Sequence, residues 1–262
     1  WAGHVQLTYR LDDNALVYAS AARGYKVGGF NLDRMQSNTG LSSGTGGIVQ
    51  VDDTSFAPET VESYEIGVST GFGEGKGRFD LALFHQRHSG FQLTGVVGNA
   101  SFIRSVPEVT STGFDAAVAW RSGGFRFRTG FSHADTQYGD DALPGADLAL
   151  LPGSQLSHAP KWTITGAVGY AMPLGEAMQL DANLGGKFLS AHNTSRDLNP
   201  AAMQDSYVLV DARLGLGRKD KGWGVELWVH NLFDVDYLTE SFNPLLQAGS
   251  LNGFVGAPRT YG

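Results

Sequence analysis

His85 and His88, in the segment HQRH, are a pair of potential metal ligands. Imidazole binds transition metals, but both rings must reach the same ion. Side chains of a strand alternate between its two faces, and an odd number of positions separates these two rings. Without a bulge they point in opposite directions. We therefore expect no metal site here, and nothing else in the sequence indicates a bound cofactor.

The serines and histidines fall into no spacing that is typical of nucleophilic catalysis. The sequence contains neither H-E-x-x-H nor G-x-S-x-G. The glycine-rich segment SSGTGG (residues 42–47) lacks the lysine and the following helix of a phosphate-binding loop, so we expect a flexible loop segment. We predict no catalytic residue and no enzymatic activity.

The segment RGYKVGGFN (residues 23–31) combines charged, aromatic and amide side chains with closely spaced glycines. Arg23, Tyr25, Lys26 and Asn31 are candidates to line the vestibule of a ligand site. They equally suit a structural role at a strand end, because glycines permit tight bends there. The segment NLFDVDY (residues 231–237) allows the same two interpretations, and its Asn and Asp side chains suit bonds to nearby backbone.

The composition excludes several classes of protein. A net charge of -7, with 17% charged residues, argues against a nucleic-acid-binding protein, which needs a basic face. The absence of cysteine excludes a disulfide scaffold and thiolate metal sites. No apolar run approaches the ~18 residues of a transmembrane helix. The chain opens at Trp1 with what reads as the middle of a strand, so we expect both ends of the natural protein to lie outside it.

Alternation of apolar and polar residues recurs along the chain. In FRFRTGFSH, Phe125, Phe127 and Phe131 share one face, while Arg126 and Arg128 share the other. Period two with a sustained apolar face indicates half-buried strands. We predict eleven of them, near residues 4–11, 14–22, 60–72, 78–95, 101–121, 124–138, 158–171, 177–192, 205–217, 222–236 and 254–262.

The connections between these strands alternate in length. Short turns such as RSGG and RKDKG alternate with long connections near residues 23–59, 96–100, 139–157, 193–204 and 237–253. Outer-membrane barrels have this arrangement, and several strands exceed the ~9–11 residues that cross a bilayer. Strands of a soluble sandwich are usually ~5–6 residues long. We therefore predict an all-β fold, an antiparallel up-and-down transmembrane β-barrel in a bacterial outer membrane.

Electrostatics predicts which face of each strand meets lipid. An arginine at the bilayer midplane costs about 2–4 kcal/mol. The charged faces must therefore point into the lumen, with Arg126, Arg128, Lys187, Asp211, Arg213, Glu226, Trp228 and His230. Leu227 and Val229 then face lipid. Arg87 breaks this parity, which we interpret as the strand having left the membrane. Candidate interfacial aromatics are Tyr9, Phe72, Phe79, Trp120, Phe125, Trp162, Tyr170 and Trp223.

Six segments carry a family resemblance: YASAARGYKVGGFN (18–31), FAPETVESYEIGVST (56–70), STGFDAAVAW (111–120), HAPKWTITGAVGY (158–170), VHNLFDVDY (229–237) and GAPRTYG (256–262). In this order and spacing they resemble the β-barrel of TonB-dependent outer-membrane receptors. In that family a barrel of twenty-two strands encloses an N-terminal plug domain. The resemblance implies that residues 1–262 form the C-terminal part of the barrel, eleven strands, and that the plug is not in this sequence.

The resemblance also implies a function: uptake of a scarce nutrient, most often a ferric siderophore, energised by the TonB complex acting on the plug. The expected partners are the TonB complex, outer-membrane lipid and a small iron chelate. Two alternatives remain, a passive porin without a plug, and an outer-membrane enzyme. The enzyme would need an acid and a serine beside one of the histidines of the long-loop side, which are His88, His133, His158 and His192.

The long connections are the regions in which we expect ligand contacts, because binding residues concentrate on loops held by a rigid scaffold. The segment after residue 138 mixes carboxylates with an apolar patch formed by Leu148, Leu150 and Leu151.

Overall fold

The computed structural model describes residues 1–31, 55–97, 100–143, 148–244, 247 and 249–262. Eleven strands form one antiparallel sheet, and their order in the sheet is their order in the chain. They are β1 (Gly3–Arg10), β2 (Ala15–Lys26), β5 (Glu59–Phe72), β6 (Gly77–Val97), β7 (Ala100–Ser122), β8 (Phe125–Tyr138), β9 (Trp162–Leu174), β10 (Met178–Leu189), β13 (Tyr207–Arg218), β14 (Gly224–His230) and β17 (Thr260–Tyr261). The predicted up-and-down sheet of eleven strands is confirmed.

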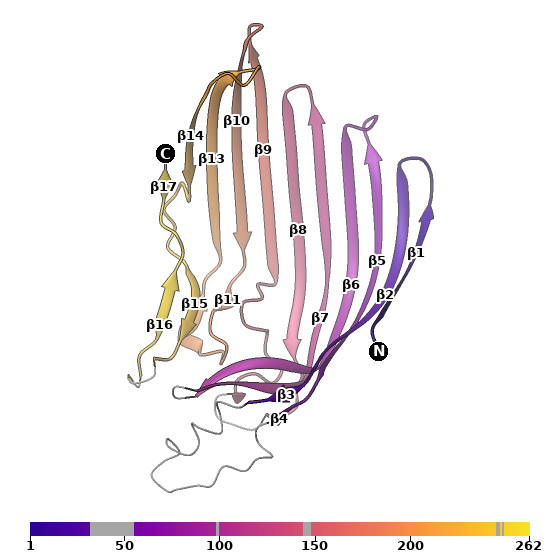
Figure 1. Ribbon diagram of the computed structural model, residues 1–262, viewed down its shortest axis with the longest axis vertical. Coiled ribbons are helices and arrows are strands. Elements are labelled where there is room, and N and C mark those ends of the chain that lie inside the picture. The colour runs from indigo at the N-terminus through magenta and orange to yellow at the C-terminus, as the bar shows by residue number, and fades with distance from the viewer. Residues whose placement is uncertain (32–54, 98–99, 144–147, 245–246, 248) are drawn as a thin grey trace, which may run out of the picture.

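The sheet curves into an open trough, with β1 along one edge and β17 along the other (Figure 1). Three two-stranded ribbons extend its connections: β3 (Gly29–Phe30) with β4 (Ser55–Phe56), β11 (His192–Asn193) with β12 (Met203–Gln204), and β15 (Leu238–Phe242) with β16 (Asn252–Val255). A 3-10 turn, η3 (Pro200–Ala202), precedes β12. Among the described residues, no helix is long and apolar enough to span a membrane.

Tight turns join the strands at one end of the trough, which we call the short-turn end, and longer connections lie at the other, the long-loop end (Figure 1). One predicted long connection is wrong. β6 continues to Val97 and β7 resumes at Ala100, which leaves only residues 98–99 between the two strands. The distal part of this hairpin turns away from the barrel strands and crosses the long-loop end beside β3 and β4 (Figure 1).

Turns and prolines interrupt three of the predicted strands. β9 begins at Trp162 rather than 158, because His158 has a positive φ of 58° and Pro160 lacks an N–H group. β14 ends at His230, because Asn231 turns the chain with a φ of 50°. The last predicted strand is divided between β16 and β17, and Pro258 lies in the gap.

The apolar side chains of the barrel strands point outward, away from the concave face. Ile66, Leu83, Leu184, Leu214 and Leu227 are each about half exposed or more. Leucines left in water at this density would form a surface patch far larger than soluble monomers carry. The lipid-facing prediction accounts for them, since a barrel in a membrane turns its apolar band outward.

Aromatic rings lie at both ends of this apolar band. At the short-turn end, the rings of Phe125 and Tyr170 are 4.4 Å apart between centroids. Eight residues further along β8, the ring of His133 lies 4.5 Å from that of Trp162. Eight residues of strand span about 26 Å, or about 20 Å along the membrane normal at a typical tilt. That span is close to the ~25 Å height of the apolar band in outer-membrane barrels.

Candidate functional site

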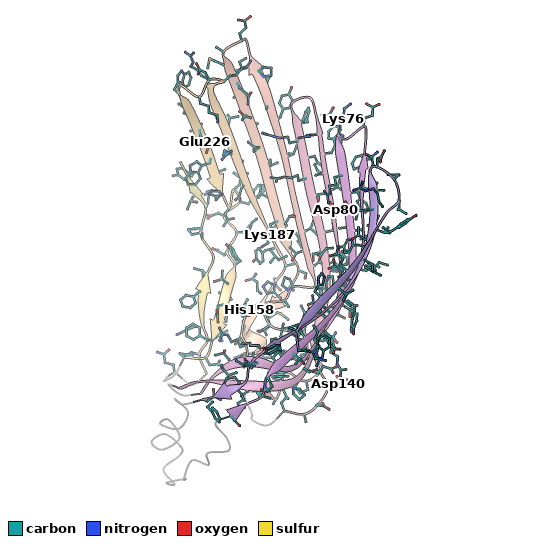
Figure 2. The ribbon with its side chains drawn as sticks, turned by 45° about the vertical axis from the view of Figure 1, so that its right-hand side comes forward. Lys76, Asp80, Asp140, His158, Lys187 and Glu226 are labelled. Atoms are coloured by element: carbon teal, nitrogen blue, oxygen red, sulfur yellow. The ribbon has the colours of Figure 1, made fainter. Side chains whose placement is uncertain are left out.

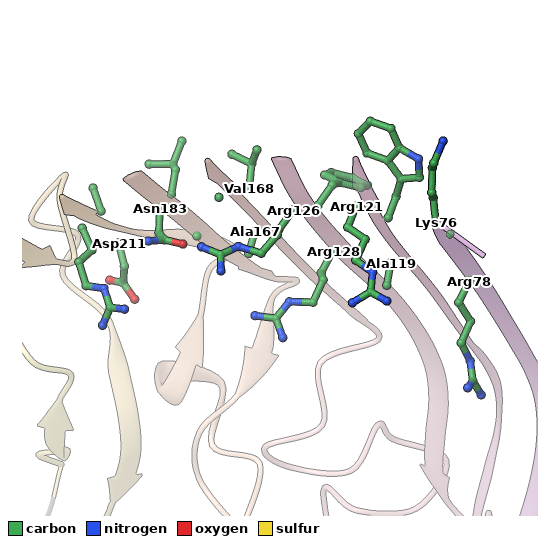
Figure 3. A pocket seen from close by; sticks show the side chains of 18 of the residues that line it. Lys76, Arg78, Ala119, Arg121, Arg126, Arg128, Ala167, Val168, Asn183 and Asp211 are labelled. Carbon is green, nitrogen blue, oxygen red and sulfur yellow. The ribbon is translucent and has the colours of Figure 1, made fainter. Parts of the chain in front are cut away.

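The inner face of the trough is the polar face of the strands. Register places Arg128 opposite Ala119 on one side and Ala167 on the other, and Gly185 and Asp211 continue the same row. Small residues between charged ones leave space above the wall. A cavity of about 970 Å³ lies there, and Figure 3 shows Arg78, Arg121 and Arg128 pointing to one side while Val168 points to the other.

The side chains that the sequence assigns to the lumen lie together on this face. Seven of them are among the residues that line the cavity: Arg126, Arg128, Asp211, Arg213, Glu226, Trp228 and His230. Lys187 is not in that lining: it lies opposite Thr165, one row nearer the long-loop end than Asp211. Figure 2 shows Lys76 and Glu226 toward the short-turn end, and His158 and Asp140 toward the long-loop end.

Cross-strand ion pairs join several of these charges. Arg126 lies 3.5 Å from Asp181 on β10, Arg213 lies 3.4 Å from Glu226 on β14, and the ring of His230 lies 3.4 Å from Asp211 on β13. All are more than a third exposed, so each contributes little to stability. Their consequence is a wet, charged wall rather than a packed core.

The four vestibule candidates separate onto different surfaces. Alternation along β2 places Lys26 on the inner face with Tyr18, whereas Arg23 and Tyr25 share the outer face with Val17. The Arg23 guanidinium stacks 4.9 Å over the Trp1 ring and lies 3.8 Å from Glu62. The phenol of Tyr25 is exposed. A ligand role for these residues stays a prediction.

Asn31, the fourth candidate, is 8% exposed and belongs to a contact that the sequence did not indicate. Its Nδ2 donates to the Ile103 carbonyl at 2.8 Å, and the Ile103 N–H donates to its Oδ1 at 2.6 Å. The side chain thereby ties the segment after β3 to the distal hairpin of β6 and β7. We call the part of this hairpin beyond Gly90 and Pro107 the β6–β7 arm.

Two further side chains hold the arm against the segment around β4. Gln92 Nε2 donates to the carbonyls of Val27 and Ala57, at 2.9 and 3.1 Å. The Ala57 N–H donates to Ser105 Oγ at 2.9 Å. With the pair of Asn31, these bonds fix the arm across the long-loop end of the trough.

The bend at the base of the arm has a specific cause. Gly90 has a φ of +68°, and it lies opposite Pro107, which cannot donate a ladder bond. Glu59 accepts from both sides of the bend, with one oxygen 3.0 Å from His88 Nδ1 and the other 3.1 Å from the Gln92 N–H. The backbone at Gly90 and Pro107 and the two bonds to Glu59 therefore fix the direction of the arm.

A small hydrophobic core lies at the long-loop end, formed by Val106, Val109, Tyr138, Leu148 and Leu151, which we call the loop core. Leu151 is fully buried, whereas Leu150 beside it is 50% exposed. The apolar patch of the sequence is thus divided. Two of its leucines pack the connection onto the strands, and one reaches solvent.

A second cluster joins two connections at the long-loop end through polar groups. Thr194 and Ser241, both buried, bond through their hydroxyls at 2.8 Å. Asn243 Nδ2 donates to Asp197 at 2.6 Å, and Arg196 lies 3.4 Å from Glu240. The loop after β10 and the ribbon β15–β16 therefore form one structured surface.

The turn after β14 confirms the structural interpretation of its amide and carboxyl side chains. Asn231, buried, exchanges two bonds with the backbone of Val235 at 2.9 and 3.0 Å. Asp234 accepts from the Arg259 N–H at 2.8 Å, which ties this turn to the last strand.

His85 and His88 do not converge. His85 Nδ1 bonds to Thr112 Oγ1 at 2.7 Å, while His88 bonds to Glu59. Over the described parts of the chain, no three His, Asp or Glu side chains are placed to hold a metal ion together. The SSGTGG segment lies outside the described residues.

A curved antiparallel sheet with an apolar outside, a charged inside and structured loops at one end matches a known family. The family model described as TonB dependent receptor-like, beta-barrel, matches residues 1–232. The chain belongs to this family. It is therefore part of an outer-membrane receptor barrel, and it is not an enzyme.

Solved structures agree with the receptor barrel in fold. The ferric yersiniabactin uptake receptor FyuA from Yersinia pestis superposes with a TM-score of 0.78 at 20% identity, over 99% of this chain and 36% of that one. The siderophore receptor PiuA from Acinetobacter baumannii gives 0.71 at 18% identity, over 99% and 34%. BauA, the ferric preacinetobactin receptor of the same species, gives 0.68 at 18%, over 99% and 35%. The chain spans about a third of the length of these receptors.

The residues that sequence reasoning missed on the receptor barrel are those whose partners are far away in the chain. Gln92 and Ser105 carry no local signal, because their contacts cross 35 and 48 positions. For Arg23 and Tyr25, in contrast, the sequence does indicate the direction of the side chain. Both lie an even number of positions from Val17, so alternation along the strand assigns them to the same outer face.

Proposed function

We propose that this chain is the C-terminal half of the barrel of a receptor that imports a scarce nutrient, and that the nutrient is a ferric siderophore. The observation that carries the proposal is the family match over residues 1–232. The neighbouring solved structures support the ligand class, because they include receptors for ferric yersiniabactin and ferric preacinetobactin. At 20% identity or less, the similarity to these neighbours supports the fold alone. The ligand of this chain is therefore our inference.

The arrangement of the described residues suits such a receptor. The bent β6–β7 arm, the loop core and the cluster around Thr194 give the long-loop end a structured surface. In outer-membrane barrels the long loops are extracellular, so a ligand arriving from outside meets this surface first. Energy for import would come from the TonB complex, acting on a plug domain that belongs to the rest of the receptor.

Uptake of radioactive iron tests the proposal in the bacterium that carries the receptor. Cells with and without the intact receptor gene are grown under iron limitation, and each is given a panel of ferric siderophores. We expect one chemical class to require the receptor, the TonB complex and the proton-motive force. Equal uptake in both strains for every siderophore would reject the ligand class. Passage of small solutes that persists in a strain without TonB would favour the passive porin.

A further inference from the structure

Arg87 breaks the alternation of its strand, because it shares the outer, apolar face of Leu83 instead of the inner face. The register extends its row across two further strands. Arg87 lies opposite Glu62 on β5, and Glu62 lies opposite Arg23 on β2. All three side chains therefore point out of the barrel, and we call them the outer charged row.

The outer charged row lies just beyond the apolar band, toward the long-loop end. Leu83 pairs with Phe114, which stacks on the aromatic pair at that end of the band. Tyr64 and His85 form the next outward row, two residues or about 5 Å further along the membrane normal at a typical tilt. Headgroup layers are about 5–8 Å thick. The charged row follows after two more residues, and its long side chains can reach back into this layer.

The outer charged row has hydrogen-bond donors that its carboxylates leave available. Glu108 accepts from the Nε of Arg87 at 2.6 Å, yet the arginine side chain remains 57% exposed. Glu62 lies 3.8 Å from Arg23, too far for a hydrogen bond. The Nδ1 of His85 bonds to a neighbouring threonine at 2.7 Å, which leaves its Nε2 for a ligand.

The surroundings of the outer charged row suit a lipid rather than a free anion. Tyr64 precedes the row on β5 and Tyr25 follows it on β2, and both side chains are exposed. Tyrosine suits the boundary of a membrane, because its ring is apolar and its hydroxyl is polar. Ile66 and Leu83 lie on the same face nearer the midplane and offer an apolar surface to acyl chains. A free anion would leave that surface unused.

We propose that the outer charged row, together with His85, binds the phosphate of a lipid headgroup in the outer leaflet. A planar guanidinium offers paired N–H donors in the geometry of a phosphate. The leaflet is the outer one because long loops of outer-membrane barrels are extracellular. Glu62 and Glu108 offset the charges of the two arginines, so binding rests on directed hydrogen bonds rather than on long-range attraction.

The experiment uses the full-length receptor, purified in detergent, freed of native lipid and titrated with lipid A, with binding measured by native mass spectrometry. Arg23→Gln and Arg87→Gln are made singly and together. Arg196→Gln is the control, because it removes an arginine that lies 3.4 Å from Glu240 at the same end but outside this row. Dephosphorylated lipid A keeps the sugars and acyl chains, and so tests the phosphate alone.

We expect lipid A to bind the native receptor and the control variant with affinities within about twofold. Binding should weaken at least about tenfold in the double variant and about threefold in each single variant. Dephosphorylated lipid A should bind the native receptor about tenfold more weakly. Added salt should weaken the native affinity less than about threefold. The unfolding temperature without lipid should change little, because these ion pairs are solvent-exposed.

Unchanged affinity in the double variant, or equal binding of dephosphorylated lipid A, would overturn the site. Displacement of lipid A by an equal concentration of inorganic phosphate would show an anion site without preference for lipid, which also overturns it. If the double variant fails to fold, unchanged affinity in both single variants rejects the proposal. These measurements involve no transport, so their failure leaves the import proposal standing.

Discussion

Asn31 and Ile103 pair through two hydrogen bonds as adjacent strands do, although 72 positions separate them. The amide side chain of Asn31 both donates to and accepts from the backbone of Ile103. A side chain thus takes the place of a neighbouring strand, and it does so where the β6–β7 arm has turned away from the barrel sheet. The position of the arm over the long-loop end depends on this pair and on Gln92.

Asn31→Ala should release the arm. Both Ile103 groups would lose a buried partner, at about 1–3 kcal/mol of local stability. We expect amide hydrogen exchange at Ile103 to accelerate about tenfold or more, while exchange in the barrel strands stays unchanged. Asn14→Ala, at an exposed turn position, is the control. Unchanged protection at Ile103 in the Asn31 variant would mean that the arm is held by other contacts.

Gly90→Ala should disturb the bend at the base of the arm. The residue has a φ of +68°, and an added Cβ would lie 2.6 Å from the Pro58 carbonyl oxygen, which belongs to the backbone and cannot swing aside. We expect the arm to lose about 1–3 kcal/mol of local stability, measured by hydrogen exchange across the arm. Gly75→Ala tests the backbone conformation alone, since its φ is +80° with no atom within 4 Å of the new Cβ. An equal loss of local stability in the Gly90 and Gly75 variants would show that a small shift relieves the contact with Pro58.

Leu151→Ala should open the connection after β8. Leu151 is fully buried in the loop core, and removing a buried leucine side chain costs about 2–5 kcal/mol. Protease cleavage within residues 139–157 is the readout, because the loop can open without unfolding the barrel. Leu150→Ala, one residue away and 50% exposed, should change the cleavage rate little. A similar rate in both variants would contradict the loop core.

Leu214→Arg should destabilise insertion into lipid. Leu214 lies on the outer face in the middle of β13, opposite Leu227. An arginine near the midplane costs about 2–4 kcal/mol, measured by urea unfolding of the receptor in lipid vesicles. The next residue gives the control: Gly215 faces inward between Asp181 and Glu226, so Gly215→Arg should cost far less. Comparable losses would mean that the two faces are assigned wrongly.

His158 should make the long-loop end sensitive to acid. Burial lowers the pKa of its imidazole, with His192 and Arg196 acting in the same direction and Glu240 opposing them. In the unfolded chain the imidazole titrates near ~6.5 and takes up its proton first as the pH falls. The uncharged His158 ring therefore contributes its full share to the stability of the long-loop end above about pH 6.5. This contribution is lost progressively as the pH falls below that value.

Hydrogen exchange measures this effect at the His158 amide, which donates to the Asn193 carbonyl at 2.8 Å. We expect protection to decline between about pH 7 and pH 5. His158→Asn keeps a side chain that tolerates the φ of 58° and should flatten the profile, whereas His4→Asn on β1 should not. A profile that persists in the His158 variant would place the titrating group elsewhere.

The sequence predicts the barrel sheet well because one physical constraint acts on every strand. Lipid excludes charge, so Phe125 and Phe127 must share a face that Arg126 and Arg128 cannot occupy. The same constraint sorts Leu227 from Glu226, and alternation then gives the strands and the order of long and short connections.

The constraint ends where the strands leave the membrane, and prediction becomes less accurate there. Nothing local to Gln92 indicates that its amide bonds to Val27, and no periodicity distinguishes Leu151, which is buried, from Leu150, which is exposed. The position of Arg121 is hidden in the sequence for a related reason. It lies beside the turn RSGG, where a charged residue suits solvent, and only the register reveals that it faces Arg126.

The bonds between Thr194 and Ser241 and between Asp197 and Asn243 have a consequence for recognition from outside the cell. An antibody or a bacteriophage that approached this surface would meet an epitope assembled from two stretches of chain more than forty residues apart. A synthetic peptide copied from either stretch alone would lack its counterpart. Antisera raised against such peptides should bind the denatured protein and fail on living cells.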